Sequence, residues 1–313
     1  ARHGQPVEQI AALNAISVTD RLFPGQPLAV PRAALQPEPL RFGAVTQVQV
    51  PAQIVQGRTG RVIVQTKRPL ELAGAWNELP ISFTPIGGDP LRQFAYLPAP
   101  ALIAPASYWL TLSYTASNGL VLNQSWPVAV AAGPYETQAL NLPPDRGALL
   151  DPALIQPELE KVVAVWSQRS PELLWTQVFS RPIGMEYETT SPFGTRRSYD
   201  GGPPTDYHAG QDFGAPPGVP VVAPGDAVVA LAEPLVVRGN AVILDHGRGI
   251  FSGYWHLSEI KVVPGQTVRT GDLLGLVGNT GLSTGAHLHW ELRIYGVAVD
   301  PMQFVEEPLA VAP

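Results

Sequence analysis

The sequence predicts a multidomain protein of mainly β structure. Charged residues make up only 15% of the 313 residues, whereas glycine occurs 30 times and proline 34 times, a balance that favours short strands and turns over long surface helices. This length suits two or three domains, and a hydrophobic content of 45% is enough to give each of them a packed core.

Residues 1–36 combine a short helical pattern with a turn and a terminal strand. The apolar residues spaced for one helix face are Val7, Ile10, Ala11 and Leu13. The segment resembles the second half of a LysM module in the following residues: Leu13-Asn14, Pro24-Gly25-Gln26 and Ala29-Val30-Pro31. The first strand and helix of such a module have no counterpart, so we expect a partial LysM-like segment. The resemblance implies binding to the glycan of peptidoglycan; the alternative is an amphipathic helix packed on its neighbour.

Residues 37–133 alternate with period two in short runs separated by Gly, Pro and Asn turns. In the run SYWLTLSY, one face holds Tyr108, Leu110, Leu112 and Tyr114, and the other holds Trp109, Thr111 and Ser113. A turn at residues 117–119 would pair this run with LVLNQSWPVAV in a hairpin. We expect an immunoglobulin-like β-sandwich that acts as a spacer or positioning domain, with glycan or protein binding as the alternative.

Residues 134–178 form a proline-rich linker with one helix. Asp151 is suited to the amino-terminal cap and Pro152 to the first turn. The apolar stripe expected to pack is Leu159, Val162, Val163 and Trp166. We interpret this helix as packing rather than function.

Residues 179–307, followed by a short tail at 308–313, hold five of the six histidines. Four of these lie in short segments that also contain Gly, Asp or an aromatic residue, namely His208, His256, His287 and His289. In HAGQDF, Gly210 separates His208 from Asp212 and is expected to let the backbone turn so that both side chains converge. In AHLHWELRIYG, apolar and polar residues alternate strictly, which predicts a strand whose polar face carries His287 and His289 roughly 6.6 Å apart. Such clustering of imidazole and carboxylate groups indicates a metal site.

The order of these motifs resembles peptidase family M23, the lysostaphin-type and LytM-type zinc endopeptidases. The motifs are SPFGTRR, H-x-G-x-D, Y-x-H-L and T-G-x-H-L-H-W-E, and the likeness spans about residues 190–304. It implies an antiparallel β-sheet domain that hydrolyses peptide bonds in the stem peptides or crosslinks of bacterial peptidoglycan. It also places the chain in the cell envelope, either periplasmic or secreted.

Carried over by position, the resemblance implies that His208, Asp212 and His289 bind Zn²⁺ and leave a fourth position open, as in catalytic zinc sites. His256 and His287 would form the catalytic pair, and either of them could be the general base. A tyrosine that steadies the transition state would be Tyr199 or Tyr207. The isolated histidines His3 and His246 are expected on the surface or hydrogen-bonded in the core.

Three other functions are compatible with parts of the sequence. A silent or masked family member could bind peptidoglycan or activate another wall hydrolase, but all five site residues are present. A biotinyl or lipoyl carrier domain needs a lysine at a hairpin tip, and Lys261 is not in such a place. A cupin-type metal site takes a further histidine well downstream of its H-x-H pair, and none follows His289.

Charge and composition exclude several other classes. A net charge of −6 argues against nucleic acid as a partner. No apolar stretch reaches the roughly 18 residues of a membrane span, and the first ten residues lack an apolar signal core. The absence of cysteine leaves His, Asp and Glu as the metal ligands and rules out a cysteine nucleophile.

Overall fold

The structure is a computed structural model that describes residue 11 and residues 16–19, 40–140, 151–199 and 206–309. The chain divides into two compact units, Ala1–Leu40 and Arg41–Pro313. In the first unit, Ala11 is helical and buried, and its carbonyl accepts a hydrogen bond from the Ile16 amide at 3.0 Å. Apart from Ala11 and residues 16–19, the LysM-like segment lies outside the described residues, and that resemblance stays a prediction.

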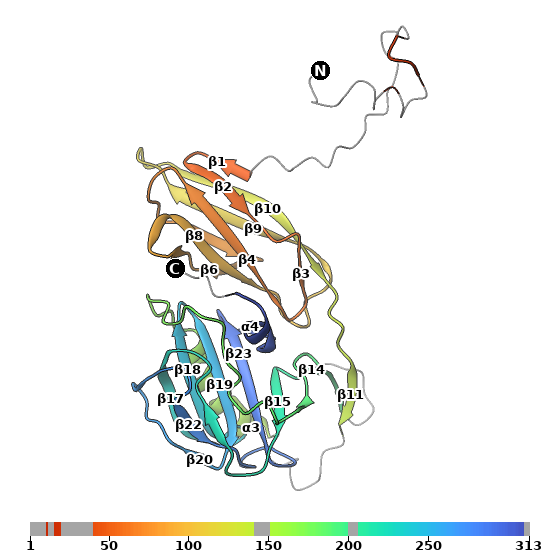
Figure 1. Ribbon diagram of the computed structural model, residues 1–313, viewed down its shortest axis with the longest axis vertical. Helices are drawn as coiled ribbons and strands as arrows, with labels where there is room; N and C mark the ends of the chain where they lie inside the picture. The colour runs from red at the N-terminus through yellow and green to blue at the C-terminus, as the bar shows by residue number, and fades with distance from the viewer. Residues whose placement is uncertain (1–10, 12–15, 20–39, 141–150, 200–205, 310–313) are drawn as a thin grey trace. The chain divides into compact units, whose positions relative to one another are not determined.

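Residues 40–131 form two five-stranded sheets (Figure 1). The first has the order β1-β2-β4-β8-β7, with the bounds β1 Leu40–Phe42, β2 Val45–Gln49, β4 Thr59–Thr66, β7 Thr84–Ile86 and β8 Asp89–Pro98. The second has the order β3-β10-β9-β5-β6, with the bounds β3 Gln53–Val55, β5 Ala73–Trp76, β6 Leu79–Ile81, β9 Ala106–Thr115 and β10 Val121–Ala131. Among β2 to β10 the neighbouring strands run antiparallel, apart from the parallel pair β3 and β10.

The predicted hairpin in this region is confirmed. Strands β9 and β10 pair from Val121 opposite Thr115 to Val130 opposite Ala106. The two faces of this run differ in burial, because Leu110 and Leu112 are fully buried whereas Trp109 is 60% exposed. The immunoglobulin-like connectivity of the two sheets stays a prediction, as do the domain boundaries.

The linker continues into the carboxy-terminal part of the chain through β11 (Thr137–Leu140) and α3 (Pro152–Trp166). The predicted cap is present, since Asp151 Oδ1 accepts a hydrogen bond from the Ala153 amide at 2.9 Å. The predicted apolar stripe is only half right: Val162 and Trp166 are buried, but Leu159 and Val163 are exposed. The position one turn before Val162 on the buried face is instead taken by a glutamate, Glu158.

The carboxy-terminal domain is built on an eight-stranded antiparallel sheet (Figure 1). Its order is β12-β15-β23-β19-β18-β17-β21, with β24 also on β23, and the bounds are β12 Thr189–Ser191, β15 Gly210–Gly214, β17 Ala227–Leu235, β18 Gly239–Gly247, β19 Ile250–Leu257, β21 Thr267–Val268, β23 His287–Ile294 and β24 Val297–Val299. The antiparallel sheet predicted for this domain is therefore confirmed.

Two three-stranded sheets and a short helix complete the domain. One sheet has the order β11-β13-β14, with β13 Arg196–Tyr199 and β14 Asp206–Tyr207. The other has the order β16-β22-β20, with β16 Pro220–Val222, β20 Glu259–Ile260 and β22 Leu273–Leu276. The helix is α4, Met302–Glu306. No helix of the described residues is long and apolar enough to cross a membrane.

One face of the eight-stranded sheet is covered by α3. Its Val162 and Trp166 form a buried cluster with apolar side chains of β17, β18 and β19, namely Leu231, Ala241, Ile243, Phe251 and Trp255. Strands β18 and β19 are therefore buried along nearly their whole length. This leaves the polar face of β15 and β23 as the place for chemistry.

Candidate metal centre and active site

The metal-site residues come together through the register of neighbouring strands. In the pairing of β15 with β23, Asp212 lies opposite His289 and Gly214 lies opposite His287. On the other side of β23, Trp255 of β19 lies opposite His289, so His256 follows directly beside the site. The predicted alternation of β23 is confirmed, because Leu288, Trp290, Leu292 and Ile294 are all buried on its apolar face.

Three ligand atoms converge on one point. His208 Nε2, Asp212 Oδ1 and His289 Nδ1 are the closest atoms of a group that could hold a metal ion. His208 Nε2 lies 3.0 Å from His289 Nδ1 and 3.1 Å from Asp212 Oδ1, and His289 Nδ1 lies 2.8 Å from Asp212 Oδ1. Ligands at about 2.0–2.1 Å from a tetrahedral zinc ion are roughly 3.3 Å apart, so the observed spacing is close to that of a zinc coordination shell.

In His208 and His289, the ring nitrogen that points away from the candidate metal position determines whether the other nitrogen carries a lone pair. His208 Nδ1 lies 3.1 Å from the carbonyl oxygen of Pro192, which can only accept, so Nδ1 carries the hydrogen and Nε2 has a lone pair. His289 Nε2 lies 3.5 Å from Glu291 Oε1, an ion-pair distance without the geometry of a hydrogen bond. With the hydrogen of His289 directed to that carboxylate, two imidazole lone pairs and one carboxylate oxygen face each other, an arrangement that a cation satisfies.

The electrostatics of the group favour a charged carboxylate. Burial raises the pKa of Asp212, but His289 and His208 outweigh that effect and hold this pKa well below its usual range. Burial also lowers the pKa of His208, although its hydrogen bond to Asp212 offsets part of the shift. Burial lowers the pKa of His289 as well, but Asp212 and Glu291 outweigh burial and raise it. An anionic Asp212 with a neutral His208 is the protonation pattern that metal binding requires.

His256 and His287 lie together beside these ligands. Their ring centroids are 4.8 Å apart, and the ring of His256 is 6.2 Å from that of His289. Each Nδ1 donates to a backbone carbonyl, His256 to Thr280 at 2.8 Å and His287 to Gly285 at 2.8 Å. Both rings therefore keep a lone pair on Nε2, and His287 Nε2 lies 3.8 Å from Asp212 Oδ1.

His256 has a lowered pKa and a left-handed backbone conformation. Burial and the neighbouring imidazoles of His289 and His287 lower its pKa to about 3, so the ring is neutral at physiological pH. Its backbone φ is +63°, a left-handed conformation that residues with a Cβ adopt at a cost of order 1–3 kcal/mol. Such a conformation persists only where neighbouring groups fix it, which makes those neighbours part of the site.

Gly210 has a different purpose from the one predicted. The expected turn is absent at Gly210, which is the first residue of β15 and pairs with Glu291. A Cβ at this position would lie 2.6 Å from His289 Nε2 and 2.6 Å from the Trp290 carbonyl oxygen. Glycine is required here because the His289 imidazole occupies the space between His208 and Asp212.

Sequence reasoning missed a second layer of residues around the ligands. Glu291 is 5% exposed, and its Oε2 accepts a hydrogen bond from Arg293 Nε at 3.0 Å. Burial raises the pKa of Glu291, but Arg293 and His289 outweigh burial and hold this pKa far below its usual range. The available signal was the polar face of β23, on which Glu291 and Arg293 follow His289 at intervals of two residues.

The other predicted residues are less closely tied to the ligands. Tyr207 is half-buried, packs against Phe193 with ring centroids 5.9 Å apart, and has its pKa raised by burial. Tyr199 ends β13 opposite Leu140, and a contact to substrate by either tyrosine stays a prediction. His246 is confirmed as a core histidine: it donates to the Asp226 carbonyl and accepts from Ser252 Oγ. His3 lies outside the described residues.

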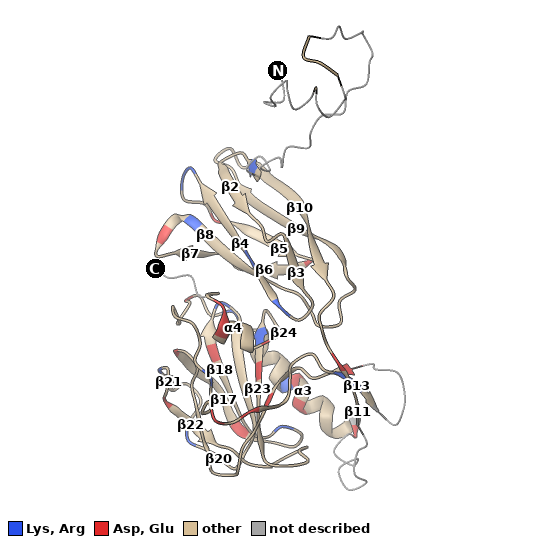
Figure 2. Cartoon of the chain, turned by 45° about the vertical axis from the view of Figure 1, so that its right-hand side comes forward, with Lys and Arg blue, Asp and Glu red and all other residues tan. Residues whose placement is uncertain are grey.

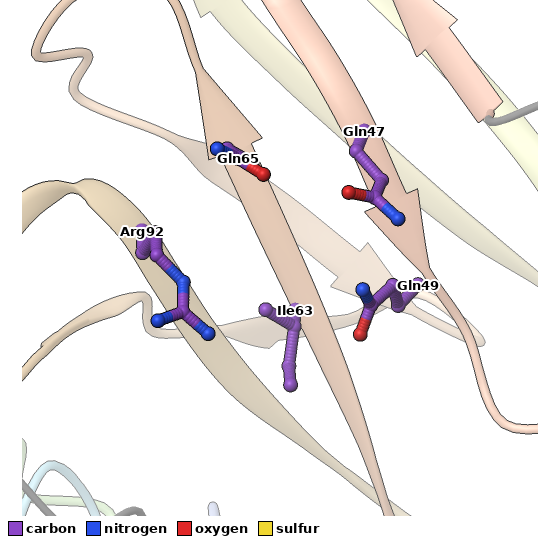
Figure 3. A pocket seen from close by; sticks show the side chains of 5 residues that line it. All are labelled: Gln47, Gln49, Ile63, Gln65 and Arg92. Atoms are coloured by element: carbon purple, nitrogen blue, oxygen red, sulfur yellow. The ribbon is translucent and has the colours of Figure 1, made fainter.

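A separate hollow of about 300 Å³ lies on the strands β2, β4 and β8 (Figure 3). Its lining is Gln47, Gln49, Ile63, Gln65 and Arg92. Carboxamides, a guanidinium and an aliphatic side chain offer neither a general base nor a carboxylate ligand, so this hollow is not a second hydrolytic site.

Comparison with known proteins agrees with this geometry. The model of peptidase family M23 matches residues 206–301. An uncharacterized metalloprotease of Haemophilus influenzae is 41% identical over 122 residues, which are 39% of this chain and 26% of that protein. Peptidoglycan DD-endopeptidase ShyA of Vibrio cholerae is 39% identical over 122 residues, which are 39% of this chain and 28% of that protein. The chain thus spans about a quarter of the length of these curated relatives.

A solved structure extends the likeness beyond the matched segment. A crystal structure from Pseudomonas aeruginosa that carries the name of peptidase M23 has a TM-score of 0.60 and 27% identity, and it covers 83% of this chain and 96% of that one. The shared fold therefore includes parts of the chain that precede residue 206.

Proposed function

We propose that this chain, whose residues 206–301 match the model of peptidase family M23, is a zinc-dependent endopeptidase that cuts peptide bonds in bacterial peptidoglycan. The substrate class is supported by the Vibrio cholerae relative, which is named a peptidoglycan DD-endopeptidase. The observation that carries the proposal is the convergence of His208 Nε2, Asp212 Oδ1 and His289 Nδ1 within 3.1 Å of one another. The bonds proposed to be cleaved are peptide bonds in the stem peptides or in their crosslinks.

We assign His208, Asp212 and His289 as the zinc ligands. When bound there, zinc supplies a Lewis acid that polarises the scissile carbonyl and acidifies the attacking water. Two neutral imidazoles and one carboxylate leave a fourth position for water and substrate, which suits a catalytic rather than a structural site. The buried carboxylate of Glu291 orients the ring of His289 from behind.

His256 and His287 would handle the protons. Both present a free Nε2, because each Nδ1 is engaged with a backbone carbonyl. One neutral ring can take the proton of the attacking water on its Nε2 and then pass that proton to the leaving amine. The adjacent ring, when its Nε2 carries a proton, can donate a hydrogen bond to the developing oxyanion. The low pKa of His256 makes it a weak base in the absence of metal and substrate.

Digestion of purified peptidoglycan tests the proposal. The full chain is incubated with zinc, and new peptide termini are identified by mass spectrometry, which also names the bond. His289→Ala and chelator-treated protein are expected to release nothing, whereas Lys161→Ala, which removes an exposed ion pair with Glu233, is expected to match the wild type. A wild-type protein that binds zinc and releases nothing would instead favour the wall-binding or activating role.

The remaining parts of the proposal concern the other domains and the place of action. A peptidoglycan substrate places the chain in the bacterial cell envelope. The two facing sheets of residues 40–131 support an immunoglobulin-like spacer, and the amino-terminal segment supports a LysM-like contact with glycan. A pull-down of the wild type and of a chain that lacks residues 1–36 with insoluble peptidoglycan would separate these contributions.

A further inference from the structure

The buried side of α3 carries a charged residue. Glu158 is only 6% exposed, and within the described part of the chain its hydrogen-bond partners lie in the segment between β17 and β18. Its Oε2 accepts from the Val237 amide at 2.7 Å, and its Oε1 accepts from the Arg238 amide at 3.2 Å and from the Arg238 guanidinium at 2.7 Å. Burial of an unpaired carboxylate destabilises a protein by several kcal/mol. The hydrogen bonds to residues 237–238 are therefore what allows Glu158 to lie on the buried face of α3.

The segment 237–238 in turn holds His256. The Arg238 carbonyl accepts a hydrogen bond from the His256 amide at 2.9 Å. This contact fixes the residue whose φ is +63°. Glu158 thus binds the amide side of Arg238, while the carbonyl side of the same residue binds the catalytic candidate.

The same segment also supports the loop that orients the His256 ring. The Val237 carbonyl accepts from the Leu282 amide at 2.7 Å, and Thr280 of that loop accepts the Nδ1 hydrogen of His256. The approach is close: a Cβ on Gly281 would lie 2.4 Å from the Val237 carbonyl oxygen. A shift of residues 237–238 would therefore move both the backbone and the ring partner of His256.

A second set of contacts runs from α3 to the metal ligands. The guanidinium of Arg293 lies 3.8 Å from the ring centroid of Trp166, at the end of the helix. Arg293 donates to Glu291, and Glu291 faces His289. Arg238 also lies over the Trp166 ring, at 5.6 Å, so the two sets of contacts share this indole.

We propose that Glu158 is a positioning residue for the hydrolytic reaction, which holds His256 in its reactive conformation through Val237 and Arg238. The proposal rests on the proposed function above. Glu158 lies outside residues 206–301, the segment that matches the family, so this role belongs to the helix that precedes the domain. A helix that served only to pack against the sheet would be expected to carry an apolar residue at this position. The other buried residues of α3, Val162 and Trp166, are apolar.

The chain provides a matched control on the same helix. Lys161 forms the other ion pair between α3 and the sheet, with Glu233 of β17, but both side chains are about half exposed. Removing it changes the charge and the contacts of α3 without touching residues 237–238. Glu158→Gln is the conservative variant, since its carboxamide keeps one oxygen for the Val237 amide.

The experiment uses the full chain loaded with zinc and a purified crosslinked muropeptide dimer. For Glu158→Ala we expect kcat to fall by about 10- to 100-fold, with KM within about twofold of the wild type and zinc stoichiometry unchanged. Glu158→Gln is expected to lose less, and Lys161→Ala is expected to retain the wild-type kcat. Nitrogen-15 spectra of the imidazoles, which do not depend on activity, are expected to show the Nδ1–H form of His256 in the wild type and a shifted signal in Glu158→Ala.

The outcomes separate the two levels of the argument. A wild type without hydrolytic activity contradicts the proposed function, and the His256 spectra then still decide whether Glu158 positions that ring. Wild-type kcat and unchanged His256 signals in Glu158→Ala overturn the inference. A fall in kcat that only follows the loss of zinc also overturns it. If Glu158→Ala does not fold, the same criteria apply to Glu158→Gln.

Discussion

Gly210→Ala tests the packing of the metal centre most directly. The added Cβ would lie 2.6 Å from His289 Nε2 and 2.6 Å from the Trp290 carbonyl oxygen. An ordinary contact of about 3.5 Å requires the imidazole to retreat by roughly 0.9 Å. Metal–ligand distances tolerate only about 0.2 Å, so His289 can no longer share one ion with His208 and Asp212 at its present position.

We expect zinc affinity to fall by about 10- to 100-fold and hydrolysis by at least about 100-fold in Gly210→Ala. Affinity is measured by competition with a chromophoric chelator, and the free energy of unfolding is followed in urea, where overpacking costs about 1–3 kcal/mol. The control is Gly285→Ala, whose Cβ meets no atom within 4 Å and which is expected to bind zinc like the wild type. Wild-type zinc affinity in Gly210→Ala would refute the argument that His289 needs this space.

Three further predictions follow from the site and the core. Glu291→Gln weakens the support of His289, so zinc affinity should fall by about 10-fold in the same competition assay, while folding is retained. His256→Ala should keep full zinc stoichiometry and lose about 10²- to 10⁴-fold in kcat; joint loss of zinc would instead make His256 a ligand. Burial lowers the pKa of His246 to about 4, below its unfolded value of about 6.5, so zinc-free protein should lose up to about 3 kcal/mol of stability as pH falls from 6.5 to 4. His246→Gln should show a shallower dependence in this window, and an unchanged slope would contradict the assignment.

The strands and the hairpin were predictable because their signals are local. Alternation in residues 287–294 defines both the strand and its two faces, and β23 has these bounds. The apolar residues of β9 alternate in the same way, and the turn between β9 and β10 is marked by Gly119 with φ +81°. Burial on one side of a sheet is enough to make such patterns readable in a single sequence.

The helix shows where local signals end. Leu159 and Val163 fit a helical stripe by spacing, yet the structure exposes both of them. The buried face of the helix is set by where the helix meets the sheet. At that place the backbone amides of residues 237–238 need a hydrogen-bond acceptor. A glutamate about 80 residues away in the sequence satisfies them, a pairing that no periodicity records.

The convergence of His208, Asp212 and His289 was predictable only because a family pattern fixed their order. Spacing alone gave weak evidence for His208 and Asp212, since four residues in a strand bring side chains to one face without making them converge. Convergence depends on Gly210, on the register of β15 with β23 and on the orientation of two imidazoles by Pro192 and Glu291. These are tertiary facts, and the purpose of Gly210 was accordingly mispredicted.

The buried charges around the site are better explained by position than by stability. Glu158 with Arg238 and Glu291 with Arg293 are two ion pairs whose carboxylates are almost fully buried, and burying such pairs often contributes little net stability. Each pair ends at a residue of the site, His256 in one case and His289 in the other, and both arginines lie over Trp166. Apolar replacements could fill the same volume, but they could not bind the backbone amides of residues 237–238 or face the outer nitrogen of His289. Helix α3, which precedes the segment that matches the family model, therefore carries contacts that lead to both His256 and His289.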